Sequence, residues 1–321
     1  MKKVVFIVFS TVILLSLCIS AYAERKRSFE VPAGAVIPPK ASVAIKKYEK
    51  TLPIYGECSG DEASYIIALS AFDINMTQED IHKASGLKKI RGCYSDDLYY
   101  ASMNLGIDVE SYVIRGLKSK KERLTHLNDL KYFISQGYPV VISWEEDPKK
   151  LIDGFCSMVV VVAYDDEREE ITVVDPFVGT ISGRIFSYKE FINHWQWDNS
   201  DGTYSLFMDV IKGKLEDPKS RLKTIKFRIT EGETVEFIYD ETTEDVAFFI
   251  LNLSEDEIIV SIDILDQDRT KLNKWIINDE DSPNFNVWGG GVFYFHFTSL
   301  KDQGDISITY EYKDGDLILK K

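Results

Sequence analysis

The chain has 321 residues, 45% of them hydrophobic, and a formal net charge of −14 at pH 7. Its length favours two domains, because single cores stop growing near about 250–300 residues. So acidic a surface repels nucleic acid and anionic lipid, which excludes both as expected partners.

Residues 1–23 have the pattern of a secretory signal peptide. Lys2 and Lys3 precede an apolar run of about 16 residues, shorter than the roughly 20 that span a bilayer. Ala21-Tyr22-Ala23 then provides the small-x-small pattern after which signal peptidase cleaves. Cys18 would suit a lipid-modified protein, but Leu17 stands before it, where a small residue is expected. We therefore expect an exported protein, periplasmic, envelope-bound or extracellular, with no membrane span after cleavage.

The next 190 or so residues predict an α+β domain. Residues 24–52 contain three prolines and suggest an extended N-terminal arm with a short helix over 42–49. Apolar residues at helical spacing and capping residues then predict helices over 61–72, from 77, over 95–105 and over 124–136. Apolar runs of strand length lie at 109–114, 139–144, 158–164, 171–175 and 204–210. The domain is expected to cover 53–212.

The pattern changes after an expected linker at 213–219, which contains Gly213 and Pro218. Short alternating segments, separated by acidic or glycine-containing turns, occur at 225–229, 234–239, 247–251, 258–265, 272–277, 291–297 and 305–312. Strands at this spacing, without a helical pattern, predict an antiparallel β-sandwich over 220–321.

Five segments of residues 53–210 resemble, in order, the Peptidase_C39-like branch of the papain-like cysteine peptidases. The segments are Gly60-Asp61-Glu62-Ala63-Ser64, Cys93-Tyr94-Ser95-Asp96-Asp97-Leu98, Gly137-Tyr138-Pro139-Val140-Val141-Ile142, Met158 through Asp166, and Asp175-Pro176-Phe177-Val178-Gly179. The resemblance implies a papain-like fold. More weakly, Gly289-Gly290-Gly291-Val292-Phe293-Tyr294-Phe295 resembles a strand of the pre-peptidase C-terminal type of secreted β-sandwich.

The resemblance also implies where catalytic groups would stand. A cysteine peptidase needs a thiolate at a helix N-terminus, a histidine base and a carboxylate or amide that orients the imidazole. Here the nucleophile position holds Gly60, the base position holds Ser157, and Asp175 stands at the orienting position. Residues 24–77 contain no glutamine for the oxyanion hole. The implied site is therefore degenerate.

Three thiols follow the signal peptide, Cys58, Cys93 and Cys156, which allow one disulfide at most. In the resembled fold all three border one cleft, so we expect Cys58 to be bridged to, or within reach of, Cys93 or Cys156. An alternative is that Cys58 or Cys156 acts as a displaced nucleophile. Of the four histidines, His194 is the one expected near the cleft, whereas His82, His126 and His296 are expected to be solvated or to pack.

The acid-rich segment Asp165-Asp166-Glu167 predicts a solvated hairpin turn rather than a calcium site. We expect no metal and no cofactor. The interpretation is an exported, catalytically degenerate protein that binds a peptide or protein in the former substrate cleft by adding it beside a strand. An active cysteine peptidase or transferase that uses Cys58 or Cys156 is the alternative, and a structural envelope component is a third class.

Overall fold

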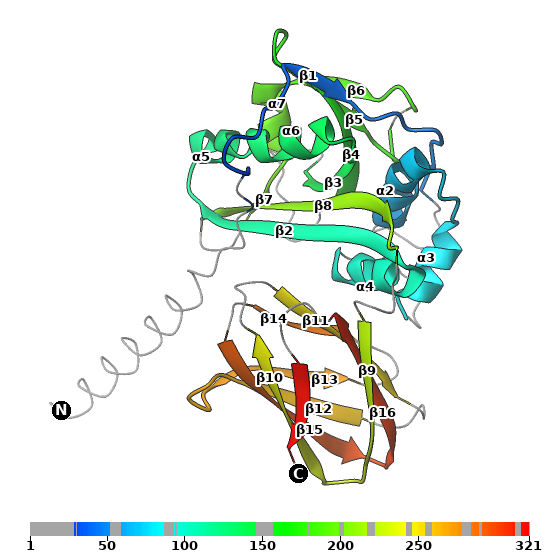
Figure 1. Ribbon diagram of the computed structural model, residues 1–321, viewed down its shortest axis with the longest axis vertical. Coiled ribbons are helices and arrows are strands. Elements are labelled where there is room, and N and C mark those ends of the chain that lie inside the picture. The colour runs from blue at the N-terminus through cyan, green and yellow to red at the C-terminus, as the bar shows by residue number, and fades with distance from the viewer. Residues whose placement is uncertain are drawn as a thin grey trace, which may run out of the picture.

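The computed structural model describes residues 29, 31–51, 59–86, 93, 95–145, 157–178, 180–198, 202–216, 222–241, 246–253, 259–277, 284–288, 291–311 and 316–320. It has the predicted order, an α+β domain with a papain-like fold followed by two antiparallel sheets (Figure 1). No helix in the described part of the chain is both long and apolar enough to span a membrane.

The helices of the first domain are α2 (Ser59–Leu69), the short 3-10 helix η2 (Ser70–Phe72), α3 (Gln78–Ala84), α4 (Ser95–Leu105), α5 (Lys120–Thr125), α6 (Leu127–Ser135) and α7 (Tyr188–His194). Three of them, α3, α5 and α7, begin at a threonine or serine whose side chain caps the helix. Thr77 with Asp80, and Ser187 with Glu190, form complete capping boxes at α3 and α7. The helix expected over 124–136 starts later, at Leu127, because α5 is a separate helix that ends at Thr125.

The helix expected over 42–49 does not form. The arm instead contributes β1 (Lys40–Ser42), which pairs with β4 (Ser157–Asp165), and then runs on without regular structure. The amide groups of Lys46 and Lys47 both donate to the hydroxyl of Ser70, at 3.1 Å. These contacts satisfy the backbone without a helix, and Ile45 and Tyr48 pack on the core beside α2.

The first sheet has the strand order β2-β8-β3-β4-β5-β6, with β1 paired to β4 and β7 to β8. The remaining strands are β2 (Ile107–Leu117), β3 (Val140–Trp144), β5 (Glu170–Val174), β6 (Arg184–Ser187), β7 (Trp197–Asp198) and β8 (Tyr204–Lys214). β8 continues into the expected linker, because Gly213 and Lys214 still pair with β2. The predicted hairpin turn lies between β4 and β5 at 166–169.

Alternate residues of β4 enter two different cores, as the period of a strand requires. Met158, Val160 and Val162 pack with α2, α3 and α4 on one face of the sheet. Val159 and Val161 pack with α6 and α7 on the other face. The sheet is therefore covered on both sides, as Figure 1 shows.

The second part is a β-sandwich whose described strands pair only with one another. One sheet has the order β13-β12-β15-β10-β17 and the other β14-β11-β16-β9. The strands are β9 (Leu222–Ile229), β10 (Thr234–Glu241), β11 (Val246–Leu253), β12 (Ile259–Leu265), β13 (Lys271–Ile277), β14 (Asn284–Trp288), β15 (Gly291–Lys301), β16 (Gly304–Glu311) and β17 (Asp316–Lys320). Phe237 and Phe295 from one sheet meet Phe249 and Tyr310 from the other in a shared aromatic core.

α4 is where the two parts meet. In Figure 1 it lies beside the end of the sandwich formed by β11 and β14. The hydroxyl of Tyr100, in α4, accepts a hydrogen bond from the backbone amide of Phe249 in β11 at 3.2 Å. Tyr100 is fully buried, so this bond is shielded from water.

Candidate functional site

Gly60 stands in the first turn of α2, and two polar side chains of that helix fix its position against β4. The carboxylate of Asp61 accepts from the amide of Met158 at 3.1 Å, and the hydroxyl of Ser64 donates to the carbonyl of Met158 at 2.7 Å. Ser157 is the preceding residue, the first of β4. The contacts thus bring the nucleophile position and the base position to the same end of the sheet.

Asp175 follows β5, the strand beside β4, and both of its carboxylate oxygens are engaged. Oδ1 accepts from the amides of Phe177 and Val178, at 2.8 and 3.2 Å. Oδ2 accepts from the guanidinium of Arg184 at 3.0 Å. The side chain is buried, and it shapes the turn at 175–178 rather than holding an imidazole.

The turn that Asp175 holds places an aromatic ring against Gly60. A Cβ atom built on Gly60 would lie 2.2 Å from Cε2 and 2.8 Å from Cζ of Phe177. Any side chain at position 60 would therefore have to displace that ring. Tyr48 braces the same turn, since its hydroxyl donates to the carbonyl of Asp175 at 3.0 Å.

His194 has a packing role in the structure. Its ring stacks on that of Trp144 with centroids 4.6 Å apart, and its Nδ1 lies 2.7 Å from the carbonyl oxygen of Glu145. Trp144 is the register partner of Ser157, so the imidazole of His194 lies near the end of the sheet where β4 begins. Cys58 and Cys156 lie outside the described residues, and their separation from His194 stays a prediction.

Cys93, the third candidate thiol, is buried and free. A bridge between Cys58 and Cys93 is therefore not formed. The expectations that Cys58 lies within reach of Cys93, or is bridged to Cys156, fall outside the described residues. Burial, followed by the nearby charge of Glu62, raises the pKa of the Cys93 thiol well above its ordinary value. A thiol in such surroundings is inert as a nucleophile.

Glu62 and His82 lie beside Cys93, a grouping that sequence reasoning missed. One carboxylate oxygen of Glu62 accepts from the amide of Cys93 at 2.9 Å, and burial raises the pKa of Glu62 to about 7. A ring nitrogen of His82, Sγ of Cys93 and a carboxylate oxygen of Glu62 all lie within 4.8 Å of one another. His82, which was expected to be solvated or to pack, is half-buried. The three residues are 11 to 31 positions apart, and no local pattern links them.

Large apolar side chains are exposed near Gly60 and Asp175. Among the described residues, eight large hydrophobic side chains are exposed, and four of them fall within positions 177–185: Phe177, Val178, Ile181 and Ile185. Ile185 belongs to β6, the edge strand of the sheet, and is 63% exposed. Arg184 connects the start of that strand to Asp175. An apolar surface therefore adjoins β6, whose outer edge pairs with no other strand of the described residues.

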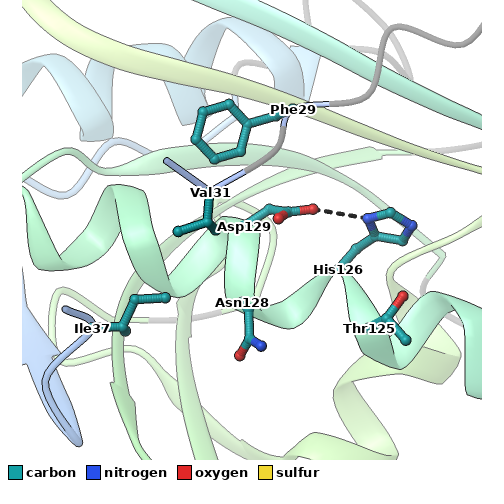
Figure 2. Close-up of a pocket in the computed structure, with 7 residues that line it drawn as sticks. All are labelled: Phe29, Val31, Ile37, Thr125, His126, Asn128 and Asp129. Carbon is teal, nitrogen blue, oxygen red and sulfur yellow. Dashed lines mark hydrogen bonds and ion pairs between the residues drawn. The ribbon is translucent and has the colours of Figure 1, made fainter. Parts of the chain in front are cut away.

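A separate pocket lies on the other face of the sheet, where the N-terminal arm crosses the junction of α5 and α6 (Figure 2). Its walls are Phe29, Val31, Ile37, Thr125, His126, Asn128 and Asp129. Nδ1 of His126 lies 2.8 Å from Oδ2 of Asp129, which ties the imidazole to its own helix. The pocket is distinct from the Gly60 end of the sheet.

Comparison with known proteins agrees with this geometry. Residues 55–203 match the model of the Peptidase_C39 like family, whereas no curated protein matches the chain. Among solved structures, the crystal structure of the Yersinia pseudotuberculosis-derived mitogen is 11% identical, and the match covers 31% of this chain and 96% of that one. Its TM-score of 0.25 is too low to support an argument. The part of the chain that carries Gly60, Ser157 and Asp175 is therefore similar to the Peptidase_C39 like family.

Proposed function

We propose that this chain is an exported, catalytically degenerate relative of cysteine peptidases that binds an extended peptide at its former substrate cleft. The observation that carries the proposal is the ring of Phe177, which occupies the space where a side chain at position 60 would project. A site of this shape has surface for binding but no nucleophile at the family position.

The charges around α2 support the loss of thiol chemistry. A catalytic thiolate needs positive surroundings that lower its pKa. Here the first turn of α2 carries Asp61 and Glu62. Burial, and then the nearby charge of Glu62, raise the pKa of Asp61, and Asp209 and Asp97 raise it further. These carboxyl groups disfavour an anionic sulfur at this end of the helix.

The edge strand β6 supports peptide binding. An extended peptide can add to a free strand edge, with its backbone bonding to the strand and alternate side chains entering surface pockets. Exposed Ile185 and Ile181 would contact apolar side chains of such a peptide, and Phe177 and Val178 would extend that contact toward Gly60. The expected ligand is an extended peptide with apolar residues at every second position.

The activity arm of the test uses the chain from residue 24 onward, with a random-peptide mixture as substrate and mass spectrometry as the readout. We expect no cleavage above buffer, whether the thiols are reduced or oxidised. Cleavage that disappears in Cys58→Ala or Cys156→Ala would establish the alternative, an active enzyme with a displaced nucleophile.

The binding arm selects peptides from a random library on the immobilised chain and measures their Kd by calorimetry. Ile185→Asp should weaken binding at least ~10-fold, because a buried unpaired charge costs well over 1.4 kcal/mol. Ile276→Asp, at an isoleucine of β13 that is 52% exposed, is the matched control and should leave Kd unchanged. Enrichment of no peptide, or equal effects of the two variants, would contradict the proposal.

A further inference from the structure

We propose that Glu62, His82 and Cys93 form a binding site for one zinc ion. The three residues come from three segments: α2, the last turn of α3, and the position two residues before α4. Each offers one ligand atom, and the three atoms lie within 4.8 Å of one another. None of these three residues belongs to the proposed peptide surface of Phe177, Val178, Ile181 and Ile185, so either proposal can fail without the other.

The separations suit a zinc ion with modest side-chain movement. Zinc binds sulfur at about 2.3 Å and imidazole nitrogen or carboxylate oxygen at about 2.0–2.2 Å, so two ligands of one ion lie roughly 3.3–3.8 Å apart. Closing from the upper limit of 4.8 Å needs shifts of about an ångström. Three protein ligands leave the fourth tetrahedral position to a water molecule.

A buried acceptor without a partner is the independent observation that points to a ligand. Glu62 is fully buried, and its Oε2 has no hydrogen-bond partner among the described residues. Leaving a carboxylate oxygen in that condition is costly, because burial removes its water. A cation beside it supplies the missing interaction.

The other carboxylate oxygen is already held in place. The amide of Cys93 donates to Oε1 of Glu62, which fixes the orientation of the carboxylate next to the thiol. Hydrogen bonds of this kind to ligating groups orient metal ligands in known sites. The backbone at position 93 therefore presents both a sulfur ligand and the donor that positions the oxygen ligand.

The kinds of donor atom select zinc over magnesium and calcium. Those two ions prefer oxygen ligands alone, whereas a thiolate with an imidazole and a carboxylate suits zinc. Because Glu62 and Cys93 are fully buried, the ion would have a structural role. It would link α2, α3 and the segment leading into α4, the helix whose Tyr100 contacts the sandwich.

The first test adds Zn²⁺ alone, and separately Co²⁺ alone, to the chain from residue 24 onward after chelator treatment under reducing conditions. We expect one equivalent of Zn²⁺ to bind and to raise Tm, because a ligand specific for the folded state stabilises it. We expect Co²⁺ to give a thiolate-to-cobalt absorption band. Absence of both effects would overturn the proposal.

Variants then locate the site. Cys93→Ser and His82→Ala should each weaken zinc binding by more than ~100-fold, since loss of even an outer-shell partner costs about 10–100-fold. The double variant Cys58→Ser/Cys156→Ser and the single variant His126→Ala are the controls, and both should keep the cobalt band. A band that persists in Cys93→Ser, or that is lost in the double variant, would contradict the assignment.

A measurement on the unaltered chain guards against variants that fail to fold. X-ray absorption at the zinc edge should show one sulfur with nitrogen and oxygen neighbours. A shell without sulfur, or with two or more sulfurs, would overturn the site.

Discussion

The core of the papain-like domain buries six carboxylates among the described residues, whereas the described core of the sandwich buries none. Among the described residues of the sandwich, the buried polar side chains are Ser261 and Ser299. Its centre is aromatic, with Phe249 and Phe295 at a centroid distance of 5.0 Å. Burying a carboxylate is costly unless it is hydrogen-bonded, so the first domain depends on specific partners in a way that the sandwich does not.

Those partners connect elements that are distant in the sequence. Asp209, in β8, accepts hydrogen bonds from the hydroxyls of Tyr65 in α2 and Ser111 in β2. Asp61 connects α2 to β4. Such networks fix α2 in register with the sheet, and α2 carries Gly60, which the family resemblance places at the nucleophile position. The two cores therefore differ in what orders them: hydrogen bonds to buried carboxylates fix the position of α2 in the first domain, whereas aromatic packing orders the sandwich.

The largest effect should come from the aromatic core of the sandwich. Phe295→Ala leaves a cavity among Tyr239, Phe249 and Phe297, and such truncations cost about 3–5 kcal/mol. Leu300→Ala, on the same strand but 47% exposed, is the matched control and should change stability by no more than about 0.5 kcal/mol. Calorimetry of the intact chain would measure both, and similar losses would contradict the described packing.

A smaller effect, of a different kind, is expected in the papain-like domain. Asp209→Ala removes the acceptor of the buried Tyr65 hydroxyl, and an unsatisfied buried donor costs about 1–3 kcal/mol. Asp209→Asn keeps an acceptor of the same shape and should cost less. Tyr65→Phe combined with Asp209→Ala should recover part of the loss, because the Tyr65 hydroxyl that lost its acceptor is then removed, although Ser111 still loses its hydrogen bond to Asp209. If denaturant unfolding gave the same loss of unfolding free energy for Asp209→Ala and Asp209→Asn, the first domain would not depend on hydrogen bonds to its buried carboxylates in the way described.

The sequence predicts the sandwich well, because alternation along a strand is a local property. The seven alternating segments after residue 220 correspond to β9–β13, β15 and β16. β14 and β17 were missed. β14 carries asparagines at Asn284 and Asn286 within five residues, and β17 is a short terminal strand. Local patterns also predict most helices and strands of the papain-like domain. The order of its motifs predicts the family that it resembles.

Contacts across the chain set the limit of prediction at the site. The motif order correctly predicts a Peptidase_C39-like domain, but nothing near Gly60 indicates that Phe177, 117 positions later, covers it. The grouping of Glu62, His82 and Cys93 is hidden for the same reason. The prediction of a helix over 42–49 was wrong because the backbone amides of Lys46 and Lys47 donate to the hydroxyl of Ser70, which is distant in the sequence.

The smallest effect should belong to Asp166, a carboxylate of the papain-like domain that lies near the surface. Its Oδ1 accepts from Nζ of Lys131 at 2.5 Å and from the hydroxyl of Tyr188 at 2.6 Å. Partial burial acts to raise the pKa of Asp166, but these hydrogen bonds outweigh it and lower the pKa below its ordinary value. The stabilisation is therefore present above the unfolded-state pKa of ~3.9 and is lost as the pH falls through the folded-state value.

Because the side chain of Asp166 is 37% exposed, screening should limit its contribution to less than about 1 kcal/mol. Asp166→Asn should lower Tm at pH 7, and the difference from the unaltered chain should shrink as the pH approaches 2. Tyr188→Phe removes one donor and keeps the Lys131 pair, so it should reproduce part of the loss at pH 7. A Tm difference that is constant with pH would mean that the charge of Asp166 does not contribute. A loss of stability in Asp166→Asn as large as that in Asp209→Ala would contradict the expectation that an exposed carboxylate contributes less than a buried one.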